Sequence, residues 1–428
     1  MPAGLDDAMQ SSTSPGTQDL IPRALASLEG SGVTFALLPS ISGEGSTGRV
    51  VDVLLRATDI AAAERCVAGI GWLRAHSAGH GSHRFHVLYD TTTGTWHQLR
   101  FLTRLDFGPT QAYRTQLAAA CLSRRVCQDG VPVVRSEDAF WLLFLRLAWE
   151  DATPGRWAQL HRCVAGAGAR GPVAEFLATL LPGGLADLEN VFAAIRARDW
   201  EHVRRIQRQL QGRWRRARRA DIVRAHAGNW LLRRISIARS PGSSLALLGL
   251  DGAGKSTVAA KLRAEVPWPT VSLYMGVWKE SSLDRLVRHI VGAQLALRLG
   301  RLARTNLVMR YQRALGRVVL LDRHVVDATL PAPDLDWKGR VSAVLVLRTA
   351  AAPDRLVFLD APAEVVFARK GELTIEELRQ RRNHYLEMSE RYPQWVTIDA
   401  GRPLTDVLAD VSEILWEDLV RSRALTTV

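Results

Sequence analysis

The stretch at residues 245–257, LALLGLDGAGKST, constrains this chain more than any other part of its sequence. It contains Gly-x-x-x-x-Gly-Lys-Ser from Gly249 to Ser256, a pattern typical of a phosphate-binding loop between a strand and a helix. The apolar residues 245–248 favour a buried strand, and the residues from Thr257 onward favour a helix. The stretch therefore predicts an α/β fold with an anion site at one edge of its sheet.

Each residue type in this loop has a physical task. Gly252 and Gly254 let the backbone approach an anion in conformations that a side chain would forbid. Successive N–H groups, backed by the positive end of the following helix, can then surround the phosphates. Lys255 can reach the outer phosphates, and the hydroxyl of Ser256 can serve as a ligand for Mg²⁺.

The remainder of residues 241–428 alternates apolar strand candidates with helical stretches. The predicted strands are Leu245–Leu250, Val271–Met275, Val318–Leu321, Leu356–Leu359 and Trp395–Ile398. Such alternation predicts a parallel sheet with helices on both faces. Ligands of these sheets bind beyond the carboxyl ends of the strands, which is where the glycine loop lies.

Four motifs in this half occur in the order found in one family. They are GLDGAGKST, VVLLDRH at residues 318–324, VFLDAPAEVVFARKGE at residues 357–372 and TIDAGRPLTDV at residues 397–407. Together they resemble thymidylate kinase, a P-loop kinase, over most of residues 244–420. The resemblance implies transfer of a phosphoryl group from ATP, with Mg²⁺, to a nucleoside monophosphate.

The resemblance also implies roles for individual residues. Asp322 would lie near the acceptor and the metal, and Arg323 would hold the acceptor phosphate. Asp251 would contact the acceptor or a water on Mg²⁺, while Asp360 is expected to cap the following helix. The implied lid cations are Arg369, Lys370, Arg381 and Arg382. The implied nucleotide-binding residues are Gly249, Asp251, Gly252, Ala253, Gly254, Lys255, Ser256, Thr257 and Gly401, the last in an adenine-contacting loop at residues 400–402.

The acceptor half departs from the family pattern. Residues 274–279 read YMGVWK where the family has Arg-Glu-Pro-Gly, and His324 replaces the tyrosine of Asp-Arg-Tyr. A basic and apolar helical region at residues 282–317 lies where acceptor-site helices are expected. The ATP half therefore matches better than the acceptor half, which leaves acceptors other than dTMP open.

The chain before residue 241 is expected to contain a disordered tail at 1–18, an α+β domain at 19–109 and a helical region at 110–240. The α+β domain weakly resembles a nucleotidyltransferase, in which two carboxylates on one strand and a third on a neighbour hold Mg²⁺. Here Asp52 is present, but Val50 occupies the first carboxylate position. The next strand offers His97, Gln98 and Arg100. We therefore interpret this domain as degenerate and expect no transferase chemistry from it.

Two other patterns in this half suggest binding sites, but a structural interpretation is favoured for each. His80, His83 and His86 recur every third residue, although a loop entering a strand explains the run as well as a metal site does. The stretch 204–219 holds eight arginines in sixteen residues. Since these arginines are expected to surround the helix, we favour a solvated connector with Trp214 packed inward over a surface for nucleic acid or anionic membrane.

Composition limits the functional classes. Only five of the 56 basic residues are lysines, so the net charge of +13 reflects a general preference for arginine and is weak evidence for nucleic acid. The four cysteines form no C-x-x-C pair and fit reduced thiols in the cytoplasm. The chain shows no secretory signal and no apolar run long enough to span a membrane.

The sequence thus predicts a cytoplasmic phosphotransferase that uses ATP and Mg²⁺, with dTMP or a related nucleotide as acceptor. Two alternatives remain open: a kinase for a sugar or secondary metabolite, and an ATP-binding regulatory or scaffold protein without transfer activity. Expected partners are a small-molecule phosphate acceptor and a second copy of the chain.

Overall fold

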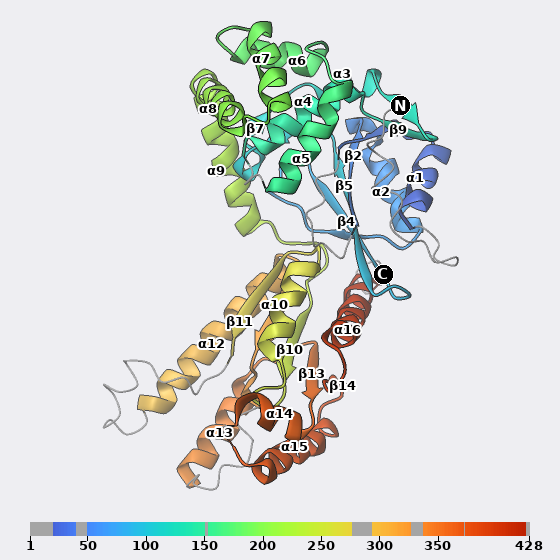
Figure 1. The fold of residues 1–428 in the computed structure, drawn as a ribbon. Helices are drawn as coiled ribbons and strands as arrows, with labels where there is room; N and C mark the ends of the chain where they lie inside the picture. Colours follow the sequence, from blue (N-terminus) through green and yellow to red (C-terminus); the bar gives the residue numbers. More distant parts are fainter. Residues whose placement is uncertain are drawn as a thin grey trace. The chain divides into compact units, whose positions relative to one another are not determined.

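The computed structural model of the chain describes residues 20–39, 49–149, 153–275, 293–326, 337–371 and 373–424. The chain divides into two compact units, Met1–Ser236 and Ile237–Val428. Each unit holds its own sheet and helices (Figure 1). No helix among the described residues combines the length and the apolarity needed to cross a membrane.

The described strands of the first unit form a mixed seven-stranded sheet in the order β3-β4-β5-β2-β1-β9-β8. Its strands are β1 (Phe35–Leu37), β2 (Arg49–Leu55), β3 (Leu73–Ala75), β4 (Arg84–Asp90), β5 (Thr95–Leu102), β8 (Val126–Gln128) and β9 (Val131–Val133), and a separate short hairpin pairs β6 (Asp106–Phe107) with β7 (Tyr113–Arg114). The helices are α1 (Leu20–Gly30), α2 (Ile60–Gly69), α3 (Ala118–Ser123), α4 (Ser136–Leu147), α5 (Pro154–Cys163), α6 (Pro172–Leu180), α7 (Leu185–Arg196), α8 (Trp200–Ala217) and α9 (Arg219–Ile235).

Both faces of this sheet are buried. Val53 and Leu55 of β2 pack with α1 and α2, whereas Leu54 joins the core formed with the later helices. The alternation follows from the pleat of a strand, which points successive side chains to opposite faces. Residues 110–240 differ from the purely helical prediction, because β9 pairs with β1 and extends the sheet.

The second unit contains the predicted parallel sheet. Five described strands, all paired in parallel, take the order β11-β12-β10-β13-β14. They are β10 (Ser244–Leu248), β11 (Thr270–Tyr274), β12 (Val318–Asp322), β13 (Arg355–Asp360) and β14 (Trp395–Asp399). The described helices are α10 (Lys255–Glu265), α12 (Ala293–Ala314), α13 (Trp337–Thr349), α14 (Ala363–Lys370), α15 (Ile375–Ser389) and α16 (Leu404–Ala424).

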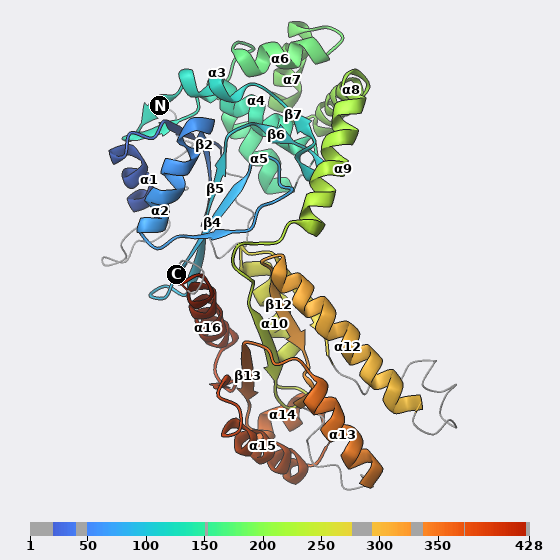
Figure 2. The ribbon, with the colours of Figure 1, turned by 180° about the vertical axis from the view of Figure 1, so that it is seen from behind.

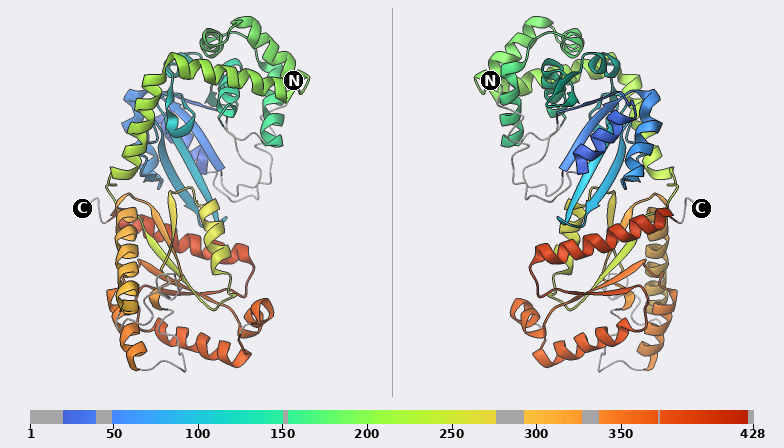
Figure 3. Two further views of the ribbon diagram at one scale, coloured as in Figure 1. Left: turned by 90° about the vertical axis from the view of Figure 1, so that its left-hand side faces the viewer. Right: turned by 90° about the vertical axis from the view of Figure 1, so that its right-hand side faces the viewer.

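Helices cover both faces of this sheet, as predicted. Parallel connections are right-handed, so the connection from β10 out to β11 and the one back to β12 lie on opposite faces. Accordingly α10 packs with α16, and α12 packs with α13 on the other face (Figures 2 and 3). Residues 276–292, which hold part of the predicted acceptor region, lie outside the described residues, as do residues 327–336, the tail at 1–18 and Glu372.

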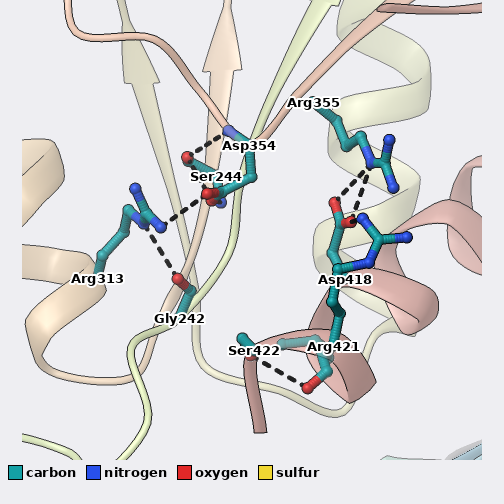
Figure 4. A network of polar contacts seen from close by, with 9 residues as sticks. Gly242, Ser244, Arg313, Asp354, Arg355, Asp418, Arg421 and Ser422 are labelled. Atoms are coloured by element: carbon teal, nitrogen blue, oxygen red, sulfur yellow. Dashed lines mark hydrogen bonds and ion pairs between the residues drawn. The ribbon is translucent and has the colours of Figure 1, made fainter. Parts of the chain in front are cut away.

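Ion pairs hold the end of this sheet that lies opposite the glycine loop. Asp354 accepts hydrogen bonds from the backbone N–H and the hydroxyl of Ser244, at 2.7 and 2.8 Å, and from the guanidinium of Arg313 at 2.8 Å (Figure 4). Arg355 donates to Asp418, which fastens α16 to β13. These contacts fix the strand starts, and therefore the positions of the loops at the other ends.

Candidate functional site

The strand order of the second unit creates a switch point between β10 and β12. The connection that follows β10 runs to β11 at one edge of the sheet. The connection that follows β12 runs in the opposite direction, to β13. Ligands of open parallel sheets bind beyond the carboxyl ends of the strands at such a point. Asp322, the last residue of β12, pairs in register with Leu247 of β10, two residues before the glycine loop begins. The geometry therefore places Asp322 beside the loop, as the sequence predicted.

Glycines determine the shape of the loop. Gly249, Gly252 and Gly254 have φ angles of 146°, 110° and 96°, all in a region that L side chains rarely adopt. A Cβ at Gly249 would also lie 2.8 Å from the carbonyl oxygen of Leu359, which is too close. The loop then turns directly into α10, whose first residue is Lys255. The first N–H groups of a helix have no carbonyl partner within it, so they form an anion site.

Lys255 is buried at 7% exposure and folds back on the loop. Its ammonium group donates to the carbonyl oxygens of Gly249 at 2.6 Å and Leu250 at 2.9 Å, and lies 3.5 Å from a carboxylate oxygen of Asp251. Ser256 and Thr257 follow on the exposed side of the helix start. A buried ammonium without such acceptors would be costly, so these contacts explain how the loop keeps a charged lysine.

Cationic side chains surround the carboxylate of Asp251. It accepts a 2.6 Å hydrogen bond from Arg323, and it faces Lys255 and Lys370. Burial alone would raise the pKa of Asp251, but Lys255 and Arg323 outweigh it and lower that pKa below its usual value. Arg323 itself has a φ of 67°, an uncommon conformation for a residue with a side chain. Strained residues of this kind concentrate at functional sites.

The end of α14 adds two more cations to the loop. Arg369 donates to the carbonyl oxygen of Gly252 at 3.2 Å. A Cβ at Gly252 would lie 3.7 Å from the Cβ of Lys370, so α14 packs directly on the loop. The structure therefore brings together Lys255, Arg323, Arg369 and Lys370 around Asp251, although their sequence positions span more than a hundred residues. Such a cluster can neutralise the charge of a polyphosphate.

Oxygen atoms suited to a hard cation also meet at this edge. The Ser256 side chain is exposed and makes no hydrogen bond with any residue that the structure describes. The half-buried carboxylate of Asp322 ends the neighbouring strand. Mg²⁺ binds hydroxyl, carboxylate and phosphate oxygens, so the donor set fits this ion.

Asp360 and Arg382 form a pair that differs from the prediction. The helix cap before α14 is Pro362, and its side chain makes no capping bond. Asp360 instead accepts two hydrogen bonds from Arg382 on α15, at 2.5 and 2.7 Å. The prediction that Asp360 caps the helix was therefore wrong, because a bidentate arginine competes for both its oxygens. The same pairing engages Arg382, one of the expected lid cations, while Arg381 remains half-buried beside it.

Gly401 lies on the same edge of the sheet, after β14. Its N–H donates to Asp399 at 2.8 Å, and the N–H of Ala400 donates to the carbonyl of Asp360. Arg402 pairs with Asp410. The loop at 400–402 is thus fixed next to the end of β13, one strand away from the glycine loop. This position is compatible with the predicted contact to a base.

The first unit shows why Asp52 differs from a metal ligand. Asp52 is 2% exposed, and its carboxylate accepts hydrogen bonds from Arg100 and Arg146. Burial would raise the pKa of Asp52, but the two guanidinium groups lower it. Two cations beside the single predicted carboxylate disfavour a divalent metal there.

The histidine run also has structural contacts. Nδ1 of His83 lies 3.0 Å from the carbonyl oxygen of His80, to which it donates when it carries the ring proton, and His86 packs against Phe101. Burial lowers the pKa of His83, which keeps its ring neutral. No group of three potential metal-ligand side chains meets within the described residues.

The arginine-rich helix α8 is more regular than the sequence suggested. Val203, Ile206, Leu210 and Trp214 form a buried stripe, so the predicted inward position of Trp214 is confirmed. The eight arginines of residues 204–219 are all exposed. The six that belong to α8 lie on the broad face opposite the stripe, so the expectation that the arginines surround the helix was wrong. Arg218 and Arg219 lie at the junction with α9. A helix with a buried stripe at positions i, i+3, i+7 and i+11 leaves the rest to solvent.

Sequence reasoning missed two features that shape the site. The pairing of Asp360 with Arg382 connects residues 22 positions apart and leaves no local signal. The start of α15, in contrast, is fixed by a capping box in which Thr374 and Glu377 bond each other's backbone. The pattern Thr-x-x-Glu before an apolar residue is a signal that could have located this helix start.

Comparisons with known proteins add a likeness at the level of the fold. No protein-family model matches the chain, and no curated protein does. Among solved structures, thymidylate kinase from Candida albicans is similar to 42% of this chain and 93% of its own, with 18% sequence identity and a TM-score of 0.34. A TM-score of this size carries no argument about activity, so the residues described above have to support any function.

Proposed function

We propose that the chain is a phosphotransferase that moves the γ-phosphoryl group of ATP to a nucleoside monophosphate or a related phosphate acceptor. The observation that supports this most strongly is the meeting of the glycine loop, Asp322, Arg323, Arg369 and Lys370 at one edge of the parallel sheet. Phosphoryl transfer depends on positioning and on neutralising charge, and these residues offer both.

In this proposal the loop binds the donor. The N–H groups at the start of α10 and the ammonium of Lys255 hold the β- and γ-phosphates, whose oxygens replace the loop carbonyls as acceptors for the lysine. Arg369 and Lys370 neutralise the charge of the transferred group. The loop around Gly401 contacts the adenine.

Asp322 and Arg323 serve the acceptor. Asp322 orients the attacking oxygen. Arg323 releases the carboxylate of Asp251 and binds the acceptor phosphate in its place. The bond between the γ-phosphorus and the bridging oxygen of ADP breaks as the bond to the acceptor oxygen forms, and ADP leaves. Ser256 and the carboxylate of Asp322 would hold Mg²⁺, and Asp251 would contact a water on this ion, which shields the phosphate charges.

The test is transfer of label from [γ-³²P]ATP to a panel of nucleoside monophosphates and sugar phosphates. We expect one acceptor class to be labelled, and Lys255→Ala to reduce transfer by at least about a hundredfold, as loss of one charge-stabilising group does elsewhere. Lys261→Ala is the matched control, since Lys261 is an exposed lysine on the same helix. Equal transfer by wild type and Lys255→Ala would refute the site, and ATP binding without any labelled acceptor would favour a regulatory role.

A further inference from the structure

A cavity of about 470 Å³ opens within the first unit, beside α8, α9 and the β6–β7 hairpin. Four arginines border it: Arg104, Arg114, Arg218 and Arg224. We call this cavity the arginine pocket. Small-molecule sites usually occupy roughly 300–1,000 Å³, so its size suits a metabolite.

The charges of the arginine pocket do not cancel. Arg104 pairs with the fully buried carboxylate of Asp106 at 3.0 Å, and Arg224 lies 3.8 Å from Asp221. Arg114 and Arg218, in contrast, meet no acidic side chain among the residues that the structure describes. Two positive charges therefore remain, about the charge that a phosphate monoester carries with opposite sign at neutral pH.

The floor of the pocket is apolar and well packed. Trp214 is 1% exposed, and its ring lies 5.5 Å from that of Tyr113 and 5.7 Å from that of Trp149. Because Trp214 is almost fully buried, the aliphatic surface that a ligand could reach comes mainly from the half-buried Ile222 and the exposed Leu232 of α9. An anion with an attached apolar part would therefore find a surface for both of its ends.

A strained turn lies next to the lining residue Ala112. Thr110 and Gln111 both have a φ of 54°, which costs free energy in residues with side chains. Helix α9 secures this turn. The buried Asn229 donates to the carbonyl of Thr110 at 2.7 Å, and Arg233 donates to the Gln111 side chain at 2.9 Å. Strain that is maintained in this way is typical of ligand sites.

We propose that the arginine pocket binds a small phosphorylated metabolite, whose phosphate oxygens lie on Arg114 and Arg218 and whose apolar part rests on the floor. Guanidinium groups bind phosphate in a bidentate manner, and a shaped cavity restricts the ligand to a small molecule. The site is independent of the glycine loop, and it gives the first unit a binding function without any transferase carboxylates.

The probe for the test is phenyl phosphate, which combines a phosphate monoester with an apolar ring. Calorimetric titration of the full chain should show binding that is tighter for phenyl phosphate than for inorganic phosphate or phenol. The double substitution Arg114→Gln with Arg218→Gln should weaken it by at least about tenfold, because each arginine supplies charge-assisted hydrogen bonds. The loss caused by this double substitution should be the same in a Lys255→Ala background, which separates the result from the fate of the glycine loop.

Two control variants keep the test decisive. Arg213→Gln with Arg216→Gln removes the same charge from exposed positions of α8 outside the lining. Gly228→Leu fills the pocket without changing its charge, since Gly228 lines it and a Cβ there meets no atom within 4 Å; Gly212→Leu is the equivalent change elsewhere. Binding lost in Gly228→Leu but kept in Gly212→Leu supports the pocket.

Three results would overturn the proposal. The first is absence of binding of phenyl phosphate to the wild-type chain. The second is an equal loss of affinity in the two double arginine variants, which would indicate attraction by general positive charge, as for a nucleic acid or an anionic membrane. The third is retention of binding in Gly228→Leu.

Discussion

The buried histidine beside Asp322 and Arg323 gives the second unit a specific dependence on pH. His324 is 5% exposed, and its Nδ1 accepts a 3.3 Å hydrogen bond from the N–H of Val326. Burial lowers the pKa of His324 from 6.5 to about 4, and the backbone of Ala351 opposes this shift only in part. The folded chain therefore keeps this ring neutral at a pH where the unfolded chain protonates it.

Because the pKa of His324 is lowered on folding, the contribution of its neutral ring to the free energy of unfolding is fully present above pH 6.5. This contribution is lost as the pH falls toward 4. From these two pKa values, the free energy of unfolding should fall by about 2 kcal/mol between pH 7 and pH 5 on account of His324 alone. The comparison variant is His324→Asn, whose side-chain oxygen can accept the same hydrogen bond but cannot be protonated in this range.

Urea unfolding of the wild type and His324→Asn at several pH values measures the effect. The variant should lose about 2 kcal/mol less than the wild type on going from pH 7 to pH 5, whatever its stability at pH 7. Titration of the histidine resonances by NMR gives the pKa independently. Parallel stability curves for the two proteins, or a His324 pKa near 6.5, would refute the reasoning.

Three further predictions concern other parts of the chain. Asp52→Asn should destabilise the first unit by about 3–5 kcal/mol in urea unfolding, because Arg100 and Arg146 lose a buried counter-charge; a change below about 1 kcal/mol would contradict the pairing. Burial raises the pKa of Cys121 to about 12, so at pH 8 mass spectrometry should find iodoacetamide on the exposed Cys127 long before Cys121, and equal rates would be inconsistent with the structure. Gly249→Ala should weaken ATP binding by at least about tenfold, because its φ and the Leu359 carbonyl exclude a Cβ; unchanged affinity in calorimetry would argue against the loop geometry.

Much of the second unit follows from local sequence. The apolar runs located all five strands of the parallel sheet to within about two residues, since buried parallel strands are nearly continuous in apolar residues. The predicted strand at 245–250 ends at Leu248, because Gly249 takes a φ that a strand does not use. The position of Asp322 beside the loop also follows, because carboxyl ends of parallel strands share one edge.

Contacts between distant residues could not be derived in the same way. Arg146 lies 94 positions from Asp52, and nothing in the local pattern selects it as a partner. The pairing of Asp360 with Arg382 likewise depends on how α15 packs against the sheet. In α8, the spacing of Val203, Ile206, Leu210 and Trp214 did contain the answer, but the abundance of arginine obscured the apolar stripe.

Calorimetric titration of the full chain with MgATP tests the central claim most directly. The account predicts a single site whose affinity falls by at least about tenfold in Lys255→Ala, because the ammonium supplies a charge-assisted contact to the phosphates, and is unchanged in Lys261→Ala. Absence of binding heat in the wild type, or equal affinity in wild type and Lys255→Ala, would contradict the assignment of the glycine loop as a nucleotide site.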